Sequence, residues 1–212
     1  MNEIITVIDI ETTGLDPQRD HITEIAAIRA EVSDDGEGGV TIREIGRFQT
    51  FVALPPGGAI PPEITELTGI SAEDLCGAPR HWWAVDSVLD FARDSRLIAH
   101  NAPFDLAFID RIYDGLPSDG FACTRAMSRL LDPDESASLK QACERYGITL
   151  TGHHRAMNDV EATLQLYAIL RQRADAAGID YRNVVVDSAE RPLTYTPPGA
   201  RVITIDKTKG VA

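Results

Sequence analysis

A pair of carboxylates, Asp9 and Glu11, interrupts the first apolar run of the sequence, within TVIDIETTGLDP at residues 6–17. Residues two apart on a strand point to the same face, so a strand here presents both acids on a side that its apolar neighbours predict to be buried. Neighbouring carboxylates repel each other, and bound cations remove that cost. The spacing therefore favours a cation-binding site over a solvated strand face.

Two further acids, Asp105 and Asp159, lie in the first turns of predicted helices. Taken singly, either is explained by the helix dipole, which favours negative charge at the N-terminus. Together with Asp9 and Glu11 they form an all-oxygen ligand set of the kind that suits Mg²⁺ or Mn²⁺. Two such ions about 4 Å apart, bridged by one aspartate, can clamp the attacking and leaving oxygens of a phosphodiester. The four acids therefore predict metal-dependent phosphodiester chemistry.

A histidine pair precedes the last acid, in TGHHRAMNDVEAT at residues 151–163. His154 lies five residues before Asp159, on the loop that enters the helix, where an imidazole can take the proton of a metal-held water near neutral pH. Taken alone, a histidine on a loop is more simply polar surface, and His153 is an equal candidate. Combined with the acids, the pair predicts a general base without choosing between its two members.

The elements that must position these side chains follow from apolar periodicity and turn residues. Three β-rich runs separated by turn-rich segments predict an antiparallel meander, at residues 4–10, 22–32 and 42–53. A buried strand is predicted at residues 96–101, and helices are predicted near residues 63–68, 71–75, 82–94, 102–116, 124–131, 138–146 and 156–176. Ser138 is the expected N-cap of the helix that Gly147 ends. We expect an α/β fold with a mixed sheet flanked by helices.

Composition restricts the class of partner. The 212 residues are 43% hydrophobic, and the net charge of -13 argues against a cationic coat for DNA or for an anionic membrane. A nuclease remains compatible, because divalent metals reverse the sign of a carboxylate site locally. Three cysteines without CxxC spacing predict buried thiols in a reducing compartment. Without a leader or an apolar run near the ~20 residues that span a bilayer, we expect a soluble, cytoplasmic protein.

Three segments of the chain carry a resemblance to a known family. DIETTGLDP at residues 9–17, HNAPFDLAF at 100–108 and HRAMNDVEAT at 154–163 resemble, in order and spacing, the three motifs of the DEDDh (DnaQ-like) 3′–5′ exonucleases. This superfamily includes the epsilon proofreading subunit of DNA polymerase III and ribonuclease T. The contexts ITEIAAI, PPEITELTGIS and SLKQACERYGI agree as well, so that the resemblance covers roughly residues 4–172. A lone DxE is a weak signal, but three ordered motifs are specific.

The resemblance implies a role for each motif residue. It implies His154 as the general base, because Ala156 fixes the register of His-x-Ala-x-x-Asp, and it leaves His153 as a neighbour. It implies two Mg²⁺ or Mn²⁺ ions whose ligands are Asp9, Glu11, Asp105 and Asp159, and it implies that Asp9 is shared by both ions. The implied contacts to the terminal 3′ nucleotide are Thr12, Thr13, Leu15 and Phe104. His100 and Asn101 are implied to support the site, and Arg155 is implied to lie near a phosphate.

The resemblance also implies fold and function. The expected fold is ribonuclease H-like, with a mixed central sheet of an antiparallel meander plus parallel strands. The expected activity is removal of nucleoside 5′-monophosphates from single-stranded or frayed 3′ ends of DNA, in proofreading or repair, with a DNA polymerase or another replication or repair protein as partner. The alternatives are trimming of RNA 3′ ends in the manner of ribonuclease T and, in another class, a non-catalytic nucleic-acid-binding module.

The last part of the chain has no counterpart in this resemblance. We predict an exonuclease domain over residues 1–178 and a C-terminal extension over 179–212. The extension holds two β-like runs, NVVVD and RVITID, on either side of a proline-rich connector. We expect these runs to form a hairpin, to add to a sheet edge, or to be partly disordered.

Overall fold

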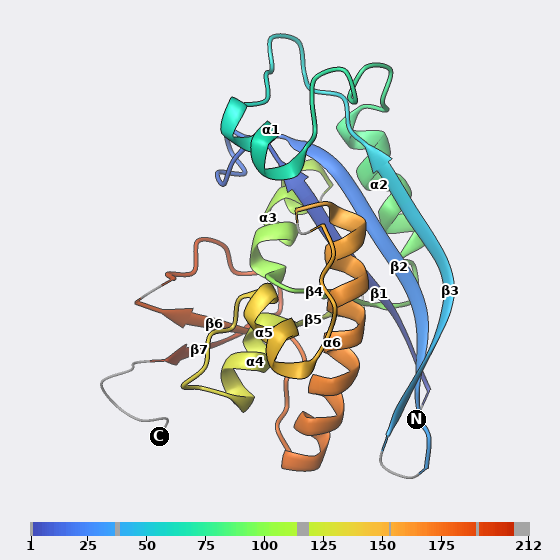
Figure 1. Cartoon of the computed structure of the whole chain (residues 1–212), viewed down its shortest axis with the longest axis vertical. Coiled ribbons are helices and arrows are strands. Elements are labelled where there is room, and N and C mark those ends of the chain that lie inside the picture. Colours follow the sequence, from blue (N-terminus) through green and yellow to red (C-terminus); the bar gives the residue numbers. More distant parts are fainter. Residues whose placement is uncertain (1, 37–38, 114–118, 153, 190, 206–212) are drawn as a thin grey trace.

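The structure is a computed structural model, and it describes residues 2–36, 39–113, 119–152, 154–189 and 191–205. Its centre is a five-stranded sheet in the order β3-β2-β1-β4-β5. Helix α6 packs on β1 and β2 from one face, whereas α2 and α3 pack on the sheet from the other (Figure 1). The side chains of β1 therefore alternate between two apolar clusters, with Ile5 and Val7 in one and Ile8 and Ile10 in the other.

The strands follow the predicted mixture of pairings. The meander is β1 (Glu3–Thr12), β2 (Ile22–Asp34) and β3 (Val40–Phe51), paired antiparallel. The parallel part is β4 (Arg96–Ala99), which pairs with β1, and β5 (Phe121–Cys123), which pairs with β4. The mixed, ribonuclease H-like sheet is thus confirmed, and β5 is an addition that three residues were too few to predict.

Six helices occur in the described part of the chain, namely α1 (Pro62–Thr68), α2 (His81–Phe91), α3 (Ala102–Ile112), α4 (Thr124–Leu131), α5 (Leu139–Tyr146) and α6 (Ala156–Ala177). The predicted caps of α5 are confirmed, because the Ser138 side chain accepts from the backbone N–H of Gln141 and Gly147 adopts a left-handed φ of 68°. The helix predicted at residues 71–75 is wrong. That stretch forms turns, in which Ser71 donates twice to the Asp74 carboxylate, so its backbone does not continue as a helix.

The C-terminal extension is folded onto the rest of the chain. Its strands, β6 (Val184–Ser188) and β7 (Arg201–Ile205), form a separate two-stranded sheet, and they pair in parallel. The hairpin prediction is therefore wrong, because the connector returns to the start of β6 before β7 begins. Val184, Val185 and Val186 are buried in the apolar cluster shared with α2 and α3. The boundary at residue 178 stays a prediction.

Two expectations from composition concern the thiols and the membrane. Cys123 and Cys143 are buried free thiols as expected, but Cys76 is exposed, because it lies in a surface turn rather than on an apolar face. No helix within the described ranges combines the length and the apolar character that crossing a bilayer requires.

Candidate active site

The first two acids lie where β1 ends. Asp9 and Glu11 are partly exposed, whereas Ile8, Ile10 and Thr12 are buried, so both acids point to the face that α6 covers. The pairing of β1 with β2 shifts register between Glu11 and Thr12, as it does at a β-bulge. Bulges re-aim side chains and end strand pairing, and they are common next to active sites.

The third acid comes from the start of α3. Pro103 suits the first turn of this helix, and Asp105 in the same turn is only 3% exposed. The Asp105 carboxylate accepts hydrogen bonds from its own backbone N–H and from that of Ile10. The bond to Ile10 ties α3 to the β1 residue that lies between the two strand acids, and so fixes Asp105 beside them.

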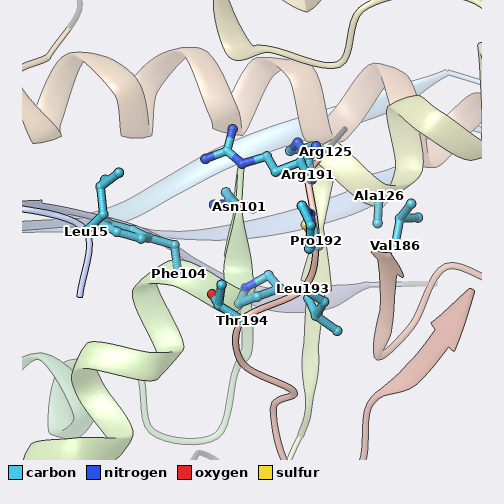
Figure 2. A pocket seen from close by; sticks show the side chains of 12 residues that line it. Leu15, Asn101, Phe104, Arg125, Ala126, Val186, Arg191, Pro192, Leu193 and Thr194 are labelled. Atoms are coloured by element: carbon cyan, nitrogen blue, oxygen red, sulfur yellow. The ribbon is translucent and has the colours of Figure 1, made fainter. Parts of the chain in front are cut away.

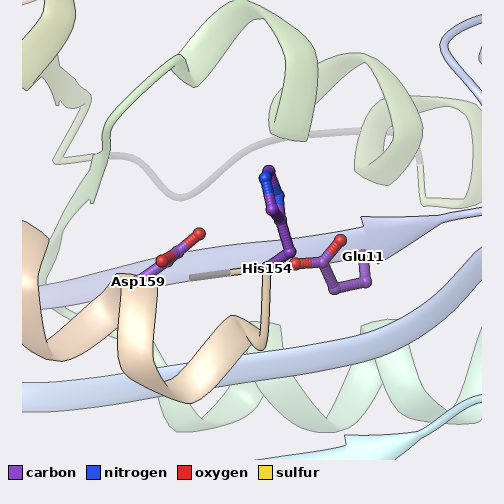
Figure 3. Close-up of side chains that lie close together, drawn as sticks. All are labelled: Glu11, His154 and Asp159. Carbon is purple, nitrogen blue, oxygen red and sulfur yellow. The ribbon is translucent and has the colours of Figure 1, made fainter. Parts of the chain in front are cut away.

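The fourth acid and the histidine come from the start of α6. Asp159 is buried in the first turn, and His154 precedes the helix with a left-handed φ of 69°. Such a φ is uncommon for a residue with a Cβ and often marks a functional position. One ligand atom each of Glu11, His154 and Asp159 lies within 4.8 Å of the other two. Figure 3 shows the imidazole of His154 standing between the two carboxylates.

Burial and neighbouring charges raise the pKa values of three of the carboxylates. Burial, followed by the charges of Asp105, Asp159 and Glu11, raises the pKa of Asp9 well above its ordinary value. Burial and then the charges of Asp159 and Glu24 raise the pKa of Glu11 to about 8. Burial is also the main reason that the pKa of Asp105 is raised to about 7. Crowded carboxylates with raised pKa values fit the binding of divalent cations, which supply the missing positive charge.

The metal-free protein should lose stability as the pH rises. Glu11 and Asp105 keep their protons in the folded chain up to about pH 8 and 7, but they lose them near 4.5 and 3.8 in the unfolded chain. Between these values the folded state binds more protons, so the free energy of unfolding falls as pH increases. We expect the Tm in EDTA to fall by several degrees from pH 5 to 8.5. Added Mg²⁺ should flatten this dependence, and a Tm that is equally pH-dependent with Mg²⁺ would contradict the assignment.

Glu24 is a buried acid at this site that sequence reasoning missed. Its side chain is fully buried on β2 opposite Glu11, and it accepts from Gln49 at 2.7 Å and from the guanidinium of Arg155 and the backbone N–H of Ala156 at 3.3 Å. These bonds hold the entrance of α6, directly after His154, against the sheet. A signal was available in the sequence, because Glu24 interrupts the apolar run ITEIAAI as Asp9 interrupts its own.

One cleft contains all five predicted catalytic residues, since Asp9, Glu11, Asp105, His154 and Asp159 all line it. Four of the predicted substrate contacts line it as well, namely Leu15, His100, Asn101 and Phe104. Leu15 is 81% exposed, so its side chain is available to a bound molecule. The structure thus brings together most of the residues that the sequence motifs single out.

His100 is held in one orientation at the edge of the cleft. Its Nε2 lies 3.0 Å from the carbonyl oxygen of Ala137, so this nitrogen donates, and its Nδ1 lies 3.0 Å from the Thr124 hydroxyl. The ring thereby joins the end of β4 to the start of α4 and to the loop before α5. This arrangement suits the supporting role that we expected for His100.

Three predicted substrate residues do not line this cleft. The Thr12 hydroxyl donates to the carbonyl of Gly14 at 2.6 Å, and the Thr13 hydroxyl accepts from the backbone N–H of His21 at 3.0 Å, so both brace the turn after β1. A side chain at Gly14 would force the Asp20 carboxylate to move. Arg155, expected near a phosphate, instead pairs with Glu24. His153 lies outside the described residues.

Two arginines also line the cleft, Arg125 from α4 and Arg191 from the C-terminal extension. Arg125 follows the strand β5 and donates its backbone N–H to the carbonyl of His100. Arg191 had no local signal, because a single arginine in a proline-rich connector belongs to no motif or periodic pattern.

Comparison with known proteins places the chain in a family. The exonuclease family model matches residues 6–167. Among curated proteins, the DNA polymerase III PolC-type of Bacillus subtilis (strain 168) is 33% identical over 97% of this chain, and that of Staphylococcus saprophyticus is 33% identical over 82%. The chain spans only 14% and 12% of the lengths of these two relatives.

Solved structures share the fold. E. coli exonuclease I in complex with a dT13 oligonucleotide has a TM-score of 0.67 at 18% identity, over 83% of this chain and 42% of that one. Exonuclease X in complex with 5′ overhanging duplex DNA has a TM-score of 0.58 at 21% identity, over 84% of this chain and 95% of that one. With these matches and the three ordered motifs, the chain belongs to the exonuclease family, within the DEDDh 3′–5′ exonuclease superfamily.

Proposed function

We propose that this protein is a metal-dependent 3′–5′ exonuclease that shortens single-stranded DNA and releases nucleoside 5′-monophosphates. The observation that carries this proposal is the cleft in which four carboxylates meet His154, and in which burial and neighbouring charges raise the pKa values of Asp9, Glu11 and Asp105. Exposed Leu15 and the aromatic ring of Phe104 lie in the same cleft, where a terminal base and sugar need apolar contacts that do not depend on sequence.

The proposed division of labour follows from these positions. Asp9, Glu11, Asp105 and Asp159 hold two divalent ions, Mg²⁺ or Mn²⁺, and bound ions supply charge stabilisation and a more acidic water. His154 accepts the proton of the attacking water. The water oxygen bonds to phosphorus, the bond from phosphorus to the 3′ oxygen breaks, and that oxygen takes up a proton.

The relatives support DNA as the substrate and a polymerase as the partner. Two curated relatives are DNA polymerases, and the present chain corresponds to 14% or less of each. We therefore propose a proofreading role beside a DNA polymerase. Exonuclease I and exonuclease X were solved with bound DNA, and their common fold with this chain is compatible with a DNA strand in the cleft.

The proposal is tested with 5′-labelled single-stranded DNA and RNA of the same sequence. With Mg²⁺ or Mn²⁺ we expect a ladder of products shortened from the 3′ end, faster on DNA, and in EDTA we expect no products. Faster shortening of RNA would transfer the proposal to RNA trimming. Shortening of neither strand, or cleavage at internal positions, would overturn it.

The contact between Glu24 and Arg155 supplies a prediction about positioning. Because these side chains hold the backbone beside His154, we expect Glu24→Gln and Arg155→Gln each to lower kcat about tenfold, as is usual for groups that orient a metal site. If the two side chains act as one unit, the double variant should lose no more than either single variant. Additive losses with a raised KM in Arg155→Gln would instead mean that Arg155 contacts the phosphate directly.

A further inference from the structure

The cleft continues past the acids into a second compartment. This compartment shares Leu15, Asn101, Phe104, Arg125 and Arg191 with the acidic part. Its remaining wall includes residues 192–194 of the C-terminal extension. Figure 2 shows the apolar side chains of Leu15 and Phe104 on one side of the compartment, Pro192 opposite them, and the two arginine side chains along its rim. We call it the arginine compartment.

The charge along the cleft changes sign. The acidic part is lined by four carboxylates besides the two shared arginines, whereas the arginine compartment is lined by these two guanidinium groups and, among the described residues, by no carboxylate. This concentration of positive charge is notable in a chain with a net charge of -13. An anionic group is therefore attracted to the compartment, and a guanidinium can donate two parallel hydrogen bonds to phosphate oxygens.

The position of Arg191 is fixed by the fold of the extension. Its backbone N–H donates to the carbonyl of Ser188 at 3.1 Å, and the backbone N–H of Leu193 donates to the Asp187 carboxylate at 2.9 Å. Ser188 and Asp187 belong to β6, whose Val185 is fully buried in the core. Arg191 itself is exposed, so the extension presents its side chain to the cleft from a supported turn.

We propose that Arg191, together with Arg125, binds a phosphate group of the nucleic-acid substrate, other than the phosphate at the carboxylates. The apolar side chains of Leu15, Phe104 and Leu193 then lie beside the attached nucleoside. The C-terminal extension is in this case part of the substrate cleft and not an appendage. This inference rests on the proposed function. The phosphate is either an internal one of the strand or one that terminates its 3′ end.

Binding is measured in a His154→Asn background with Mg²⁺, so that shortening of the strand is slowed during the titration. The probes are short single-stranded oligothymidylates that end in a 3′-hydroxyl or a 3′-phosphate, titrated over a series of salt concentrations. Arg191→Gln should weaken binding about tenfold, and the slope of log K against log salt should become shallower by about 0.7, as expected for one lost phosphate contact on a single strand. The matched control is Arg182→Gln, because Arg182 is exposed on the same extension but lines neither part of the cleft.

The outcomes separate the two sources of the phosphate. Weaker binding of both probes supports an internal phosphate, and weaker binding of the 3′-phosphorylated probe alone supports a terminal one. Unchanged affinity and salt slope for both probes, or an equal effect of Arg182→Gln, would overturn the inference. If the wild type shortens no strand, the proposed exonuclease function fails, whereas wild-type shortening with an unaffected Arg191→Gln variant rejects only the role of Arg191.

Discussion

Asp9→Asn should remove the exonuclease activity and at the same time stabilise the metal-free protein. Asp9 lies on the cleft floor, where burial and the charges of Asp105, Asp159 and Glu11 make its ionised form unfavourable and raise its pKa. Asparagine has nearly the same shape without the charge, so it relieves this repulsion. It also removes one of the four carboxylates that would hold the ions. Charge stabilisation by bound metal is worth several kcal/mol, so we expect a loss of at least about 10³-fold in kcat.

The two effects are measured on the same samples. The Tm of Asp9→Asn in EDTA at pH 8 should exceed that of the wild type. The increase in Tm on adding Mg²⁺ should be much smaller in the variant, because a ligand stabilises a folded protein only if it binds to it. Asp86→Asn is the matched control. Asp86 is exposed on α2, so this substitution removes the same charge at a position away from the cleft.

An active Asp9→Asn variant would show that the cleft is not the catalytic site. A variant that is inactive but less stable than the wild type in EDTA would point to a structural role for Asp9. Only the combination of lost activity, higher metal-free Tm and weaker stabilisation by Mg²⁺ agrees with a carboxylate placed in the cleft for cations. This opposition between stability and activity is expected where like charges are held together for function.

The motif residues show what a sequence can predict about such a site. Asp9 and Glu11 were predictable because a strand has a strict period of two. The structure shows them on the same face of β1, where they alternate with buried residues. Glu24 was equally predictable by its interruption of an apolar run, but its partner Arg155 was not. These two residues are 131 positions apart, and only the packing of α6 on β2 makes them neighbours.

The C-terminal extension shows where local patterns are insufficient. The two β-like runs were recognisable by their valines and isoleucines, but strand propensity does not distinguish parallel from antiparallel pairing. That choice depends on the path of the connector, which returns to the beginning of β6 and brings Arg191 to the cleft on its way. The role of a residue in an irregular connector is therefore a property of the tertiary structure.

His154→Asn should lower kcat about 10²- to 10⁴-fold while leaving metal binding intact, because a general base contributes to the rate without holding the ion. Asparagine is the suitable replacement, since it tolerates the left-handed backbone at this position better than alanine does. His81→Gln, at an exposed position at the start of α2, is the control.

The geometry of His154 makes this variant decisive between two roles. Its imidazole lies close enough to Glu11 and Asp159 to share an ion with them, so it can be either a base or a ligand. For a base, the increase in Tm on adding Mg²⁺ should equal that of the wild type. For a ligand, the stabilisation by Mg²⁺ would be lost together with the activity, and the proton would have to be accepted by another group in the cleft.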